Sequence, residues 1–291
     1  MIHFDKNTVS DRIILSRKGF DSSSGGCCAS PIFEDGRMLS MPIHEHPLRK
    51  TSRYGEIPTP GIPFFPTLGA VAEALSGCRM EGCNHAHLDP DIQPGMRPQG
   101  ADQRIGLFGQ SGATQTGLKN GGVKENDLFL FFGWFRRVKR VDDSLQWVPK
   151  ALDLHVIWGW LQISSIVNLP VTQEVEQIAG HHPHVTGLNR QNNALYVSEP
   201  GKTLAGFGVF PKYKQALQLT AKDSSRSRWS LPPWFAAART FNTAAAIDEG
   251  ISGNSLLTHK GQKQEFVFPT KNNKDDAAAW LNATFAALET P

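Results

Sequence analysis

The sequence predicts an α+β fold in which a curled, mainly antiparallel sheet, partly barrel-like, is flanked by helices. Two long runs rich in aromatic and β-branched residues, at 126–135 and 155–169, favour neighbouring strands of one sheet. Gly133 and Gly159 lie inside these runs and indicate bulges or bends that curl a sheet. We treat residues 1–291 as a single globular domain, with a possible soft boundary in the glycine-rich segment 109–122 between a loop-rich first lobe and a β-rich second lobe.

The remaining elements follow from local patterns taken in chain order. Residues 11–15 form a short first strand, and residues 66–77 have helical spacing, with Leu68, Val71 and Leu75 on one face and Gly77 as a C-cap. Prolines at 90, 94 and 98 predict a loop there. Shorter strands are predicted at 194–198, 206–210 and 265–268, and helices at 171–179 and 275–288.

The composition excludes several classes of protein. With 40% hydrophobic and 20% charged residues, the chain is globular and not disordered or fibrous. We see no apolar run long enough for a signal segment or a spanning helix, so we expect a cytoplasmic protein with no membrane partner. Four cysteines are too few for disulfides to stabilise a chain of this size. A net charge of +3 is too small for the protein to bind DNA by charge alone.

Two basic segments, 136–140 and 224–228, lie beside tryptophans. Cations next to aromatic rings are typical of surfaces that hold phosphates and stack bases. Two solvated basic loops are an equally good explanation of the same pattern. Trp158 and Trp160 share one face of a strand, which favours the core, although the same face at a barrel mouth would stack a base.

The segment 78–91 is rich in residues that carry chemistry. In one interpretation it binds a metal through side chains with a non-standard spacing, namely Cys78, Cys83, His85 and His87. In the second, His87 is a general acid or base, and Asp89 and Asp91 lie on the same side of an extended segment and orient it. In the third, the segment is only a polar turn.

Three other segments offer ligand contacts. Residues 19–26, GFDSSSGG, have the backbone and hydroxyl donors of a loop that holds phosphate or carboxylate, but fit neither the Walker nor the dinucleotide pattern, and a flexible turn explains them equally well. We interpret the histidines of 181–184, HHPH, as part of a helix-to-strand connector and not as a metal site. Asn192 and Asn193 either read a base edge or form a turn, with the turn slightly favoured.

Several ordered strings together resemble the bacterial family called nucleotide modification associated domain, third type, over roughly residues 10–240. They are KGFDSSSGG, SPIFEDGRMLSMPI, HLDPDI, FGQSGATQTGL, NDLFLFFGWFR, HVIWGWLQI, NNALYVS and RWSLPPWF. The resemblance implies a role near enzymes that hypermodify DNA bases, and it supplies no reaction. The strand pair is also similar to that of PUA-like barrels, including the EVE group, although Asn126 replaces their usual glycine and the long N-terminal half has no counterpart there.

We therefore expect a protein that binds a nucleotide or DNA base and acts on it, together with other base-modification enzymes. The expected catalytic residues are Asp21, His87, Asp89 and Asp91. Phosphate or sugar would lie on Ser22, Ser23 and Ser24, with Arg104 or Arg136 on phosphate and Trp134 or Trp160 stacking the base. Gln110, Asn192 and Asn193 complete the expected ligand-binding set.

Two other functions remain open at this point. One is a non-catalytic reader that binds an already modified base in an aromatic cage. The other is a metal-dependent hydrolase that uses Cys83, His85, His87 and Asp89. Our preferred interpretation assigns no metal ligand, and the sequence identifies no cofactor.

Overall fold

The computed structural model describes the chain in twelve segments. These are residues 2–20, 28–45, 51–75, 77–78, 85–93, 95–98, 101–170, 173–186, 191–237, 246–249, 255–258 and 264–289. The serine-rich segment that we expected to hold phosphate, with Asp21, Ser22, Ser23 and Ser24, lies outside the described residues.

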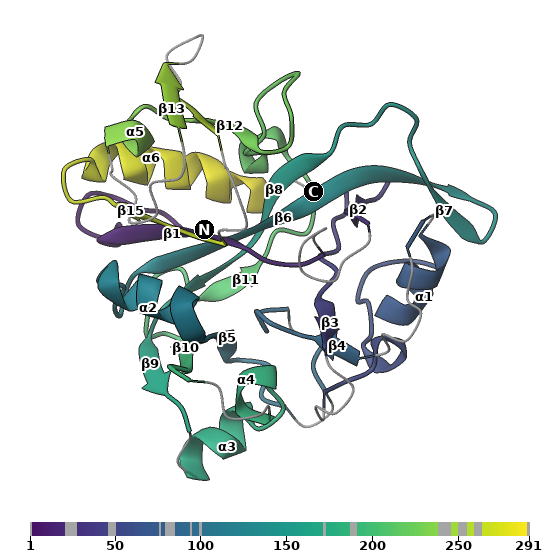
Figure 1. The fold of residues 1–291 in the computed structure, drawn as a ribbon, viewed down its shortest axis with the longest axis horizontal. Helices are drawn as coiled ribbons and strands as arrows, with labels where there is room; N and C mark the ends of the chain where they lie inside the picture. The colour runs from purple at the N-terminus through teal and green to yellow at the C-terminus, as the bar shows by residue number, and fades with distance from the viewer. Residues whose placement is uncertain are drawn as a thin grey trace.

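A seven-stranded mixed sheet crosses the middle of the molecule (Figure 1). Its order is β11-β8-β6-β1-β15, and β2 and β7 also pair with β6. Most neighbours run antiparallel, whereas β1 and β2 run parallel to β6. The strands are β1 (Arg12–Arg17), β2 (Ser30–Ile32), β6 (Leu128–Val141), β7 (Ser144–Trp147), β8 (Leu154–Gln162), β11 (Phe207–Val209) and β15 (Glu265–Pro269).

The two aromatic runs of the sequence form the centre of this sheet, because β6 and β8 are antiparallel neighbours. All nine residues of β8 are buried, which explains why the run shows no polar alternation. The pairing register shifts between Phe131 and Phe132, next to Gly159 and Gly133. A Cβ on Gly133 would lie 2.6 Å from the carbonyl oxygen of Lys18, so the close approach of the chain there requires glycine.

The sheet curls but does not close, so the barrel-like, PUA-like part of the expected fold is not confirmed. In the segments that the structure describes, β11 and β15 are the ends of the strand path and are not paired with each other. The register shift between β6 and β8 therefore lies in an open sheet and not in a closed barrel. The coarser expectation of a sheet-dominated α+β fold agrees with the structure.

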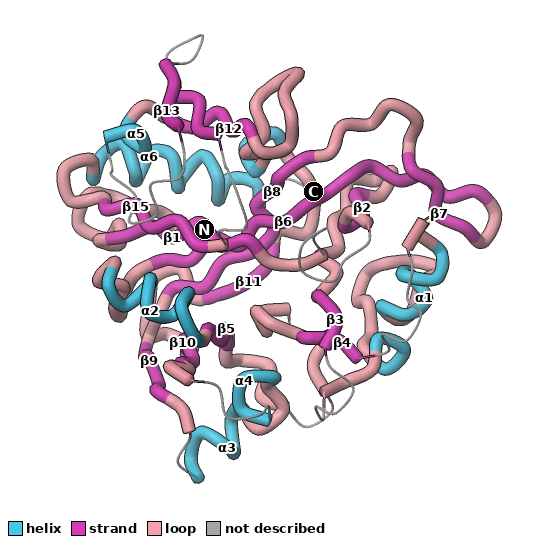
Figure 2. The backbone as a smooth tube through the Cα atoms, in the orientation of Figure 1, coloured by secondary structure: helices cyan, strands magenta, loops and turns pink. Residues whose placement is uncertain are grey.

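Three smaller sheets pack around the main one (Figure 2). One has the order β5-β10-β9, a second has the order β12-β14-β13, and β3 pairs with β4. Their strands are β3 (Ile43–Glu45), β4 (His85–His87), β5 (Gly106–Gln110), β9 (Ser165–Asn168), β10 (Ala194–Ser198), β12 (Arg228–Leu231), β13 (Ala246–Glu249) and β14 (Ser255–Thr258).

The helices are short and lie around the sheets. They are α1 (Leu68–Ala74), α2 (Gly112–Asn120), α3 (Gln173–Ala179), α4 (Pro183–Thr186), α5 (Trp234–Ala237) and α6 (Lys274–Phe285), with 3-10 turns at Tyr54–Glu56, Gln215–Leu217 and Ala286–Leu288. The Thr67 hydroxyl caps α1 by accepting a bond from the Ala70 N–H. The glycine-rich segment 109–122, which we considered as a soft boundary, contains the end of β5 and all of α2.

The largest hydrophobic cluster surrounds β6 and β8 and is unusually rich in aromatic rings. Phe108 contacts Phe129, Phe131 and Tyr196, with ring centroids 4.9 to 5.7 Å apart. Each buried ring of this size contributes on the order of 2 kcal/mol through removal from water. No helix in the described part of the chain is both long and apolar enough to cross a membrane.

Asp127, directly before β6, gives the fold a measurable pH dependence. Its side chain is 1% exposed and lies 3.4 Å from Arg12, and its Oδ2 accepts a bond from the Lys124 N–H. Burial raises the pKa of Asp127 to about 6, above its usual 3.8. The folded state therefore favours the protonated form, so the stability that this carboxyl contributes is present below about pH 4 and is lost as the pH rises through 6.

We expect Asp127→Asn to remove this dependence, because the amide stays neutral. The unfolding free energy of the unsubstituted protein, minus that of the variant, should fall by about 2 kcal/mol between pH 4 and pH 7. Urea unfolding across this range measures the difference. Asp143→Asn, the same substitution at a fully exposed carboxylate, is the control. A constant difference for Asp127→Asn would contradict the assignment.

Candidate functional site

The segments HLDPD and HHPH, far apart in the sequence, meet on one side of the main sheet. His87 is the last residue of β4, and Asp89 follows it in the loop. His184 lies in α4, which begins at Pro183, in the connection between α3 and β10. Figure 1 shows β4, β5 and α4 on the same side of the main sheet. The fold thus brings together two short polar segments whose proximity no local sequence pattern predicts.

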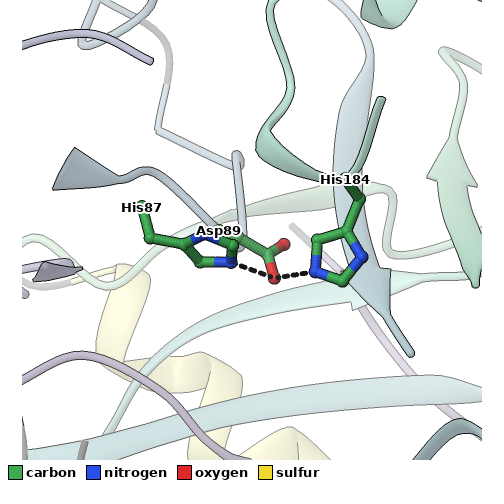
Figure 3. A group of neighbouring side chains, drawn as sticks. All are labelled: His87, Asp89 and His184. Atoms are coloured by element: carbon green, nitrogen blue, oxygen red, sulfur yellow. Dashed lines mark ion pairs between the residues drawn. The ribbon is translucent and has the colours of Figure 1, made fainter. Parts of the chain in front are cut away.

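Two imidazoles converge on one carboxylate oxygen. His87 Nε2 and His184 Nε2 each lie 3.6 Å from Asp89 Oδ2 (Figure 3). The side chains of His87, Asp89 and His184 are 11%, 5% and 3% exposed, so water screens these contacts little. Among the described residues, this is the group of His, Cys, Asp or Glu side chains whose ligand atoms are close enough to share a metal ion. We call it the His87–Asp89–His184 cluster.

The outer nitrogen of each imidazole has its own partner. His87 Nδ1 lies 2.6 Å from Glu45 Oε2, which β3 supplies from the strand paired with β4. His184 Nδ1 lies 2.7 Å from Asn193 Oδ1. The Asn193 Nδ2 donates to the His184 carbonyl, which orients the amide so that its oxygen faces the ring. Both rings are therefore held with Nε2 directed at Asp89.

The second oxygen of Asp89 is also held. Oδ1 accepts a bond of 2.8 Å from the Gly109 N–H in β5 and lies 3.2 Å from Nε2 of His182, whose side chain is fully buried. A backbone donor fixes the carboxylate without adding a mobile charge. A third histidine thus borders the cluster from the same HHPH segment as His184.

Burial and pairing separate the protonation states of the two imidazoles. Although burial alone would lower the pKa of His87, its interactions with Asp89 and Glu45 raise this pKa to about 9. Burial lowers the pKa of His184 to about 4. Burial would raise the pKa of Asp89, but His182 and His87 hold it well below its usual value. The two carboxylates thus favour the charged form of His87, whereas burial favours the neutral form of His184.

Asp91, which we expected to orient His87, instead has two other partners. Its Oδ1 accepts a bond of 2.7 Å from Arg97 Nε, and its Oδ2 lies 2.8 Å from His181 Nε2. Its backbone also exchanges two hydrogen bonds with Leu107, at the start of β5. Asp91 therefore anchors the HLDPD loop beside the cluster, while Asp89 makes the contact with His87.

The expected phosphate-binding loop begins near this site. A small pocket is lined by Asp89, Pro90, Ser40 and Trp158 and includes Gly19, shortly before the segment that contains Asp21 and the three serines. The structure therefore places Gly19 beside the HLDPD segment, and the role of the serines stays a prediction.

Three of the expected ligand residues bond to other side chains of the protein. Gln110, in β5, donates from Nε2 to Glu265, which also pairs with Lys18. Asn192 has a positive φ of 48° and bonds to Thr116 on α2, in agreement with the turn that we favoured. The side chain of Asn193 bonds to His184.

The expected stacking and phosphate-binding side chains lie elsewhere. Trp160 is 5% exposed, packs against Phe210 and Phe285 in the core, and has no free face for a base. Trp134 bonds to Asp153 and carries the Arg226 guanidinium 4.2 Å above its ring. The two remaining cations each have an acidic neighbour: Arg136 lies 4.0 Å from Asp153, and Arg104, 79% exposed, pairs with Asp102.

Sequence analysis missed the contribution of the HHPH segment. We interpreted it as a connector, and it does connect α3 to β10, but two of its histidines face Asp89. One signal in the sequence could have indicated this role: His182 and His184 are two positions apart, as are His87 and Asp89. Of the expected metal set, Cys83 lies outside the described residues, and Cys78 and His85 are not in the cluster.

Gly109 offers a test of how the cluster is positioned. A Cβ there would lie 2.3 Å from Cγ of His184, far inside contact distance. We expect Gly109→Ala to displace the His184 ring and to destabilise the protein by about 1–3 kcal/mol, as overpacking does. Imidazole ¹H–¹⁵N spectra and urea unfolding measure both effects. Gly117→Ala in α2, where a Cβ meets nothing within 4 Å, is the control. Unchanged His184 signals in Gly109→Ala would contradict the packing described.

The comparisons with known proteins identify one family. The profile described as nucleotide modification associated domain 3 matches residues 12–269, which is most of the chain and includes the whole cluster. No curated protein and no solved structure matches the chain significantly. The resemblance found in the sequence motifs is thereby confirmed, and the chain belongs to the nucleotide modification associated domain 3 family.

Proposed function

We propose that this protein is an enzyme of nucleotide-modification systems that acts on a nucleotide or a DNA base, and that the His87–Asp89–His184 cluster is its reaction centre. The observation that carries the proposal is the convergence of two oriented imidazoles on one buried carboxylate. Perturbed, buried titratable groups with fixed orientations are typical of reaction centres. Membership of the nucleotide modification associated domain 3 family supports a nucleotide or DNA base as the substrate.

The energetics support a functional role for the cluster. Burying a charged group costs several kcal/mol even after relaxation, and apolar side chains of similar volume are often as stable or more so. Glu45, His87, Asp89 and His182 are all at most 11% exposed in their side chains. Apolar side chains would connect β4 and α4 at a lower cost in free energy, so stability alone does not explain why these charged and polar groups lie together.

A basic and aromatic surface supports a nucleic-acid or nucleotide partner. The two basic segments of the sequence lie side by side, because Arg226 from one contacts Trp134, next to the other on β6. Arg136 on β6 lies 5.9 Å from the centroid of the Trp147 ring on β7. Guanidinium groups held on aromatic rings are suited to phosphates and bases.

The rival function, a reader of modified bases, has less support. An aromatic cage needs rings with open faces. Trp160 is in the core, and one face of Trp134 is covered by Arg226. The reader hypothesis also assigns no role to the buried cluster.

We expect His87→Ala, Asp89→Ala and His184→Ala each to abolish the nucleoside change that the intact protein causes, because each removes one of the three converging groups. Mass spectrometry of nucleosides, from the DNA and from the free nucleotide pool of cells that carry the gene and its neighbours, makes the measurement. A change in DNA alone identifies a polymer substrate.

His85→Ala is the matched control, since His85 lies in the same strand as His87 but outside the cluster. It should leave the nucleoside profile unchanged. Circular dichroism of each purified variant separates loss of activity from loss of folding. If no nucleoside depends on the intact protein, or if folded cluster variants keep full activity, the proposed function is wrong, and selective binding of modified DNA would then favour the reader.

A further inference from the structure

We propose that His87 Nε2, Asp89 Oδ2 and His184 Nε2 bind one divalent transition-metal ion of the Fe(II) or Zn(II) class. The inference names what the reaction centre holds, and it rests on the proposed function for the role of that ion in catalysis. It replaces the metal set considered from the sequence, since His184 takes the place of Cys83 and His85.

The spacing of the three donor atoms fits one ion. They all lie within 4.8 Å of one another, and both imidazole nitrogens lie 3.6 Å from the same carboxylate oxygen. Two ligands bound at about 2.0–2.1 Å in a tetrahedral site are about 3.3 Å apart. The two nitrogen–oxygen distances exceed this value by about 0.3 Å, and the two imidazole nitrogens, which lie within 4.8 Å of each other, need to approach by about 1.5 Å at most. Figure 3 shows both rings converging on one oxygen.

The orientation of His184 suits a metal ligand. The amide of Asn193 directs its oxygen at His184 Nδ1, so Nδ1 is the nitrogen that donates to Asn193. The other nitrogen, Nε2, lies 3.6 Å from Asp89 Oδ2. A positive ion between these two atoms would be bound by an imidazole nitrogen and a carboxylate oxygen at once.

The surroundings match the outer contacts of known metal sites. Metal-binding histidines commonly donate their second nitrogen to a carboxylate or a carbonyl group, and ligating carboxylates are themselves hydrogen-bonded. Here Glu45 holds His87, Asn193 holds His184, and the Gly109 N–H holds Asp89. All three ligands thus have their outer partners in place.

The donor set determines the class of ion. Two imidazoles and one carboxylate suit Zn(II) and Fe(II), whereas Mg(II) and Ca(II) prefer sites made of oxygen. Three protein ligands leave at least one coordination position for water or substrate, which is the arrangement of catalytic and not of structural sites.

A direct ion pair without metal is the alternative arrangement of the same side chains. In it a proton on His87 Nε2 bridges to Asp89, and His184 contributes only packing. The two arrangements differ in what they predict for Co(II), which binds Zn(II) and Fe(II) sites and reports its ligands by visible absorption.

The test is titration of the untagged, chelator-treated protein with Co(II) and with Zn(II), followed by absorption and calorimetry. We expect one ion per chain, and loss of binding in His87→Ala, Asp89→Asn and His184→Ala. Glu45→Gln, which changes an outer contact, should weaken binding about 10–100-fold. His85→Ala should bind normally. Asp89→Asn keeps the shape of the side chain and an acceptor for the Gly109 N–H. Loss of metal binding in this variant would therefore result from the lost negative charge and not from unfolding of the loop.

Absence of Co(II) and Zn(II) binding by the unsubstituted protein would overturn the inference, as would equal affinity in the folded ligand variants. The proposed function fails separately. If the protein binds no metal but its nucleoside product still depends on His87 and Asp89, the reaction centre uses acid–base chemistry alone and the metal inference is wrong. If one ion binds through the three ligands and no nucleoside depends on the protein, the metal inference stands and the proposed function is wrong.

Discussion

The burial of the Asp89 carboxylate is the constraint on which the site depends. A buried anion must be compensated, and the compensation comes from three separate elements. β4 supplies His87, β5 supplies the Gly109 N–H, and the segment around α4 supplies His182 and His184. β4 and β5 belong to different sheets, and α4 packs beside them. Their contacts with one carboxylate therefore constrain how these elements pack against one another.

The sequence allowed the main strands to be predicted, because their signals are local. The runs that became β6 and β8 are long and aromatic, and the HLDPD segment is unusual in composition. The partner of Asp89 could not be predicted in this way, since His184 reaches it only through the packing of α4 against β5. The open sheet and the helix in the glycine-rich segment 109–122 were missed for a similar reason, because tertiary contacts decided both.

The division of roles between His87 and His184 follows from their outer partners. Glu45 is an anion and favours a charged ring, whereas Asn193 is neutral and leaves its ring dependent on burial. The same two contacts orient both rings toward one point. A cluster organised in this way is suited to holding a positive ion.

Anomalous diffraction from crystals grown with Zn(II), with data collected on both sides of the zinc absorption edge, tests the central claim most directly. The account predicts one anomalous peak about 2.0–2.1 Å from Nε2 of His87, Nε2 of His184 and an oxygen of Asp89. A density map with no peak there, in which His87 bonds directly to Asp89 and the His184 ring is turned away, would contradict it.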